Sequence, residues 1–164
     1  MSVEGLGVEA EADWDHLRTP ETYLGYARSE RFASPAGAAF DDRRFYELPE
    51  RLPFNHWALA GDWTIAAENV ALDRAGGSIA FRFHARDAHL VLSPGAQGPI
   101  PFRVLLDGSA PGPSHGVDVD EHGNGMLRDG RMYQLVREHD AVRERTLEIA
   151  FLEPGAEAYA FTFG

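Results

Sequence analysis

The sequence predicts an all-β fold, a β-sandwich with aromatic side chains in its core. Ile79, Phe81 and Phe83 alternate with polar residues across 78–85, and residues 101–106 repeat the pattern. A period of two is the signature of a half-buried β-strand. Similar segments recur at intervals of roughly 8–15 residues, with glycine, proline and aspartate between them, and little helix is indicated; this is typical of sandwiches and barrels.

The strands can be placed individually from this alternation. A change of phase at Arg86-Asp87 predicts a tight turn or a bulge, and Asp107-Gly108 is a hairpin signal. In the last strand, Tyr159, Phe161 and Phe163 are expected on one side. The expected strands cover residues 57–59 and 63–65 around a Gly-Asp turn, 78–85, 101–106, 131–137, 145–152 and 157–164.

The first part of the chain has a weaker pattern. Residues 1–18 are acidic and indicate a linker or leader, so the predicted domain covers residues 19–164. Thr19-Pro20 can begin a short helical turn. Residues 27–48 are expected to be irregular, and residues 66–71 fit either a strand or one helical turn.

Composition excludes several classes of function. The formal net charge is −11, so a nucleic acid would be repelled. No apolar run approaches the ~20 residues that cross a bilayer, so no membrane insertion is expected. The chain contains no cysteine, hence no disulfide and no thiol redox chemistry of its own. No cofactor is expected.

Several motifs together resemble one family. They are GDW at 61–63, LDG at 106–108, HGVDVD at 115–120, YQLVR at 133–137, LEIAFLEPG at 147–155 and AYAFTFG at 158–164. Their order is similar to that in the C-terminal domain of DipZ-type thiol:disulfide interchange proteins and related thioredoxin-like proteins. The likeness extends from about Thr19 to Gly164.

This resemblance implies a jelly-roll sandwich similar to carbohydrate-binding modules and galactose-binding-like domains. It also implies a periplasmic or extracytoplasmic location, next to a thioredoxin-like domain. Because the chain has no CxxC motif, redox activity of such a parent protein is not carried over to it.

Polar residues of the strands and of the long loop are the candidate ligand contacts. Arginine and glutamine on the outward face of a sheet can hydrogen-bond hydroxyl-rich ligands, although a solvated face with weak cross-strand ion pairs is the simpler explanation. Exposed aromatic rings could stack on sugars. The candidate residues are Arg82, His84, Arg86, Arg103, His115, Asp118, Tyr133 and Gln134.

The 115–125 loop also suggests a weak metal site. Asp118, Asp120 and His122 fit part of a cation-binding pattern, but aspartates that cap backbone N–H groups in a turn would look the same. Ser114 and His115 are neighbours in sequence, which is not how a nucleophile usually meets its base, and no nucleophile elbow is present.

Two functions remain open from the sequence. The first is a non-catalytic module that binds carbohydrate or cell-envelope glycan. The second is a structural or docking domain that positions a thioredoxin-like domain or its protein client. An enzyme is not expected.

Overall fold

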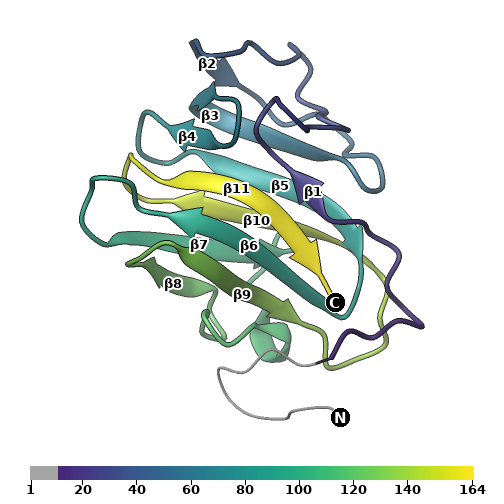
Figure 1. Cartoon of the computed structure of the whole chain (residues 1–164). Helices are drawn as coiled ribbons and strands as arrows, with labels where there is room; N and C mark the ends of the chain where they lie inside the picture. Colours follow the sequence, from purple (N-terminus) through teal and green to yellow (C-terminus); the bar gives the residue numbers. More distant parts are fainter. Residues whose placement is uncertain (1–10) are drawn as a thin grey trace.

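In this computed structural model, the structure describes residues 11–164. They form an all-β domain with one 3₁₀ turn at Gly112–Ser114 (Figure 1). The strands are β1 Thr22–Tyr23, β2 Arg43–Tyr46, β3 Trp57–Ile65, β4 Val70–Leu72, β5 Ser78–His84, β6 Asp87–Ser93, β7 Ile100–Leu106, β8 Asn124–Leu127, β9 Arg131–Arg137, β10 Glu144–Phe151 and β11 Glu157–Phe163.

The strands form a curled antiparallel sheet whose two halves face each other as a jelly-roll sandwich, as predicted. One half, here the β5 sheet, has the order β8-β7-β10-β5-β3. The other, the β11 sheet, has the order β3-β4-β11-β6-β9, with β1 beside β11 and β2 beside β3. Figure 1 shows the β11 sheet in front of the β5 sheet.

Strand β3 belongs to both halves. Its first part, Trp57 to Ala60, pairs with β5, and its second part pairs with β2 and β4. Gly61 lies between them with φ +99°, a conformation that favours glycine. The structure has strand residues on both sides of the expected bend at Gly61, but they belong to one continuous strand that changes sheets there and not to two strands separated by a turn.

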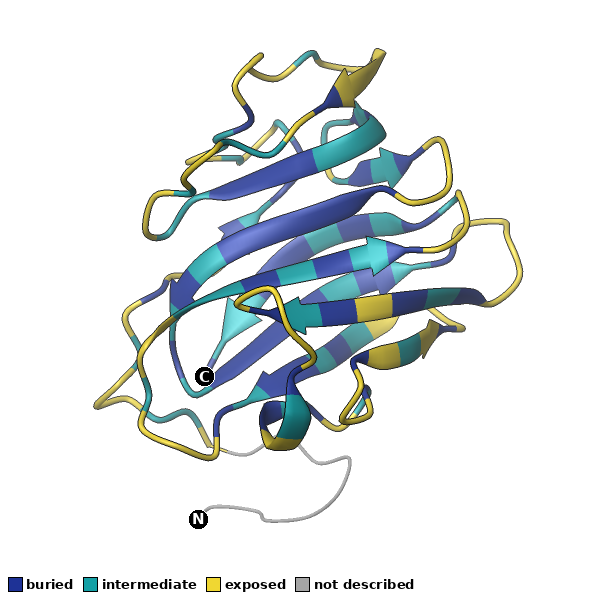
Figure 2. Ribbon diagram, turned by 180° about the vertical axis from the view of Figure 1, so that it is seen from behind, coloured by how far each residue is buried: buried dark blue, intermediate teal, exposed yellow. Residues whose placement is uncertain are grey.

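The core lies between the two halves, and the predicted aromatic residues occupy it. Phe81 of the β5 sheet contacts Phe161 and Phe163 of the β11 sheet, with ring centroids 4.9 and 5.1 Å apart. Trp57 and Trp63 are both fully buried. Seen from the β5 side, buried and part-exposed positions alternate along β10 (Figure 2), as a period of two requires.

The alternation in β11 is interrupted by a bulge. Ala158 pairs with Leu92 and Ala160 pairs with Val91, so Tyr159 is an extra residue. Ala158 and Phe161 consequently both face the core. Tyr159 is part-exposed on the outer side, so the expectation that it lies with Phe161 and Phe163 is wrong.

Three local expectations are also resolved. No helical turn begins at Thr19-Pro20: the chain continues into β1, and the hydroxyl of Thr19 accepts the N–H of His84 at 2.8 Å instead of capping a helix. Residues 27–48 include the unpredicted strand β2, which adds to the edge of β3. The phase change at Arg86 is a tight turn between β5 and β6.

Candidate functional site

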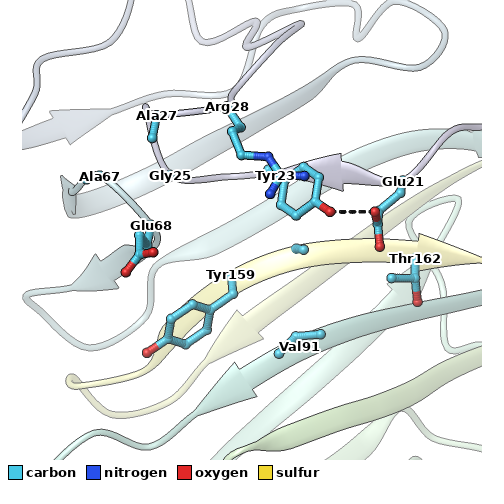
Figure 3. Close-up of a pocket in the computed structure, with 11 residues that line it drawn as sticks. Glu21, Tyr23, Gly25, Ala27, Arg28, Ala67, Glu68, Val91, Tyr159 and Thr162 are labelled. Atoms are coloured by element: carbon cyan, nitrogen blue, oxygen red, sulfur yellow. Dashed lines mark hydrogen bonds between the residues drawn. The ribbon is translucent and has the colours of Figure 1, made fainter.

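A hollow of about 470 Å³ lies on the outer face of the β11 sheet (Figure 3). Four separate segments line it: residues between 21 and 28, Ala67 with Glu68, Val91, and residues between 159 and 162. The bulge in β11 turns the Tyr159 ring into this hollow. Most of the exposed lining is apolar, with charged groups above the sheet.

Tyr23 forms one wall, and its partners fix its orientation. Its hydroxyl donates to Glu21 Oε1 at 2.6 Å, and the guanidinium of Arg28 lies over its ring, 3.6 Å from the centroid. The hydrogen bond to the Glu21 carboxylate raises the pKa of the Tyr23 hydroxyl. Tyr23 is thus held in place by a carboxylate at its hydroxyl and a cation stacked on one face of its ring.

Tyr159 lies across the hollow from Tyr23. Its hydroxyl donates to Glu157 Oε1 at 3.1 Å. Burial raises the pKa of Tyr159, a hydrogen bond with Asn69 opposes this, and the carboxylates of Glu157 and Glu68 add to the rise. The floor between the two rings is formed by Val91, Ala160 and Thr162.

Gly25 allows the chain after β1 to approach the turn before β4. An added Cβ at Gly25 would meet the carbonyl carbon of Glu68 at 2.3 Å. The two segments are also joined by backbone hydrogen bonds, from Tyr26 to the carbonyl of Ala66 and from Ala27 to that of Ala67. This contact brings Arg28 and Glu68 to the same hollow.

The structure does not bring the eight sequence-predicted residues together on one surface. Arg82, His84 and Arg103 lie on the outer face of the β5 sheet, away from the Tyr159 hollow. Arg82 pairs with Glu144 at 2.6 Å and donates to the carbonyl of Leu52. Arg82 also lines a second cavity of about 330 Å³ beneath residues 48–52.

His84 and Arg86 contact the chain's own N-terminal part. The His84 Nδ1 atom lies 2.8 Å from the carbonyl oxygen of His16, and Arg86 donates to the carbonyl of Glu11 at 2.5 Å. Arg86 also pairs with the buried carboxylate of Asp87. Whether residues 1–18 serve as a linker stays a prediction, and residues 1–10 lie outside the described part of the chain.

His115 and Asp118 lie beside β9, the strand that carries Gln134. One Asp118 oxygen accepts the Gln134 N–H at 2.8 Å, and the other accepts from Arg131 at 2.9 Å. Tyr133, by contrast, is fully buried, with its hydroxyl donating to the carbonyl of Asp129 at 2.7 Å. Its ring is therefore part of the core, and ligand contact by the remaining residues stays a prediction.

The Asp120 carboxylate bonds the backbone of the 115–125 loop itself. Asp120 Oδ1 accepts the N–H groups of His122 and Asn124, each at 2.9 Å. These backbone bonds, that from Asn124 most of all, lower the pKa of Asp120. Within residues 11–164, no group of three or more histidine or acidic side chains is arranged to hold a metal ion.

Ser114 and His115 do not form a catalytic pair. The Ser114 hydroxyl donates to the buried carboxylate of Glu138 at 2.8 Å. The Nδ1 atom of His115 lies 2.8 Å from the carbonyl oxygen of Gly116. The Ser114 hydroxyl is therefore bonded to Glu138, which pairs with Arg145, and not to the imidazole of His115.

The family model described as "Thioredoxin like C-terminal domain" matches residues 19–164. The chain belongs to this family. Among curated relatives, Protein DipZ of Mycobacterium bovis and of Mycobacterium tuberculosis are each 27% identical over 148 residues, which cover 89% of this chain and 18% of theirs. The chain thus spans less than a fifth of the length of these relatives. The resemblance to DipZ-type proteins inferred from the motifs is confirmed.

One solved structure, a family two carbohydrate esterase from Clostridium thermocellum in complex with cellohexaose, matches 59% of this chain and 27% of its own. The identity is 13% and the TM-score 0.45, and a likeness of this strength carries no weight for ligand or activity.

Across residues 11–164, no helix has the length and apolar character needed to span a bilayer.

Sequence reasoning missed most of the hollow. Glu68 and Arg28 carry no local sequence pattern that singles them out. Strict alternation places Tyr159 on the same side of its strand as Phe161 and Phe163. Only the bulge, which depends on the pairing of β11 with β6, places it outside.

Proposed function

We propose that this domain is a non-catalytic carbohydrate-binding module of an extracytoplasmic thioredoxin-like protein, and that its ligand binds in the hollow between Tyr23 and Tyr159. The feature that carries the proposal is a cavity of about 470 Å³ with two tyrosines in its walls and carboxylates at its rim. Pyranose rings have apolar C–H faces that pack on aromatic rings, and their hydroxyls need polar partners. The family is that of a C-terminal domain of thioredoxin-like proteins. Because this chain has no cysteine, we assign it a binding role beside the redox domain of such a protein.

Replacing Tyr159 tests this site. We expect Tyr159→Ala to weaken binding of neutral glucan or N-acetylglucosamine oligomers at least about tenfold, because it removes the exposed ring, whereas Tyr159→Phe keeps most of the affinity. Affinity gel electrophoresis, followed by NMR titration, measures both. Leu152→Ser changes an exposed side chain on the β10–β11 turn, outside the hollow. As the control variant, it should bind the oligomers with unchanged affinity.

A variant on the opposite face separates this proposal from the sequence-predicted one. If Arg82→Ala abolishes binding while Tyr159→Ala does not, the ligand lies on the outer face of the β5 sheet. If no oligomer binds, the carbohydrate proposal fails.

A docking role is the second candidate, and one surface favours it. Phe40 and Phe45 are 56% and 61% exposed, and Phe45 lies on the edge strand β2 next to Arg43 and Arg44. Exposed aromatic and arginine residues are enriched at protein interfaces. A docking domain would bind the thioredoxin-like domain of its own parent protein, and Phe45→Ser would weaken that complex about tenfold by calorimetry. Unchanged affinity would exclude β2 from the interface.

A further inference from the structure

The charges around the Tyr23–Tyr159 hollow are mainly negative. Glu21 and Glu68 line it, and Glu157 accepts a hydrogen bond from the Tyr159 hydroxyl. The cation that lines it is Arg28. With a net charge of −11 on the whole chain, this region attracts cations and repels anionic sugars.

The hollow already holds one cation against an aromatic wall. The guanidinium of Arg28 lies 3.6 Å from the centroid of Tyr23, a distance typical of cation–π contacts. Tyr159, on the other side of the cavity, has no such cation among the described residues. The second wall therefore offers an aromatic surface without its own positive charge.

Glu68 is the carboxylate best placed to supply a partner at that second wall. It is exposed on the turn before β4, and within residues 11–164 it makes no ion pair. Glu68 and Tyr159 line the same cavity. In Figure 3 the Glu68 side chain lies on the side of the hollow nearest the Tyr159 ring.

We propose that the hollow selects amino sugars with a free, protonated amine, the sugar ring lying on Tyr159 and the ammonium group beside the Glu68 carboxylate. This inference rests on the carbohydrate-binding function proposed above and names its ligand class. A neutral sugar can use the ring alone, whereas an amino sugar also gains the attraction of the carboxylate. Acetylation removes that gain because it removes the charge.

Three tetrasaccharides of equal length test the selectivity: glucosamine, N-acetylglucosamine and glucose tetramers. We expect the glucosamine tetramer to bind about fivefold more tightly than the other two at low salt and pH 6, measured by calorimetry. This preference should fall as salt screens the contact. It should also fall when the pH is raised until the amine is neutral.

Two variants with the same change in net charge locate the effect. Glu68→Gln is expected to bring the three tetramers to within about twofold of each other while leaving the affinity for the glucose tetramer unchanged. Glu153→Gln, an exposed carboxylate on the β10–β11 turn, should keep the preference. If both variants remove it equally, the preference comes from overall charge and the assignment to Glu68 is wrong.

The remaining outcomes separate this inference from the proposed function. Equal binding of all three tetramers, lost in Tyr159→Ala, would overturn the amino-sugar inference and leave the carbohydrate-binding function standing. Absence of binding by any tetramer would overturn both.

Discussion

Phe81→Ala is expected to lower the free energy of unfolding by about 3–5 kcal/mol, the usual cost of removing a fully buried phenylalanine. Phe81 projects from β5 and contacts Phe161 and Phe163, which come from β11 on the other half of the sandwich. Its loss would leave a cavity at the point where the two halves meet. Urea denaturation followed by tryptophan fluorescence measures the change.

Two further variants make this prediction decisive. Phe81→Leu keeps most of the volume and should cost only about 1–1.5 kcal/mol, so a measurement remains even if Phe81→Ala does not fold. Phe54→Ala removes a ring that is 39% exposed and should cost well under the Phe81→Ala value. Similar losses for Phe54→Ala and Phe81→Ala would contradict the placement of Phe81 between the two halves.

The core could be predicted because alternation is a local property. In β5, each inward residue is two positions from the next, so Ile79, Phe81 and Phe83 share a face whatever the strand pairs with. In β9 the same reasoning leaves the orientation open, because apolar residues occur on both sides of the strand. The structure shows Tyr133 and Leu135 inward, and Val136 also buried.

Features that depend on pairing between distant segments cannot be predicted from the alternation within one strand. The bulge at Tyr159 arises from the register of β11 against β6, and the change of sheets in β3 arises from its different neighbours before and after Gly61. Strand β2 has three exposed residues out of four. Its sequence therefore lacks the buried face that alternation detects.

The candidate site could not be predicted from local sequence patterns either. Arg82 and Arg103 do share the outer face of the β5 sheet, but β10 lies between their strands, and Arg86 is beyond the end of β5. The hollow beside Tyr159 combines four segments that are far apart in sequence. No local pattern marks such a site, and it becomes visible only when the sheet order and the approach at Gly25 are known.

Asp87→Ala is expected to lower the free energy of unfolding by about 3 kcal/mol, because it leaves two arginines without their shared carboxylate. The Asp87 side chain is 1% exposed and accepts from Arg137 at 2.8 and 2.9 Å and from Arg86 at 2.9 Å. Its backbone exchanges two hydrogen bonds with Gly164. Asp87 therefore joins the start of β6 to the ends of β9 and β11, and its loss should lower Tm by roughly 6–12 °C.

Asp62→Ala is the matched control, since Asp62 also lies between two arginines. Its bridges to Arg43 and Arg74 are longer, 3.9 and 3.5 Å, and both arginines are about half exposed or more. Exposed pairs of this kind contribute about 0–1 kcal/mol and are screened by salt. We therefore expect Asp62→Ala to shift Tm by a few degrees at most, and the Asp87→Ala loss to persist in high salt because its carboxylate is shielded from water. Equal shifts for the two variants would mean that the number of ion pairs, and not their burial, decides the stability of this sandwich.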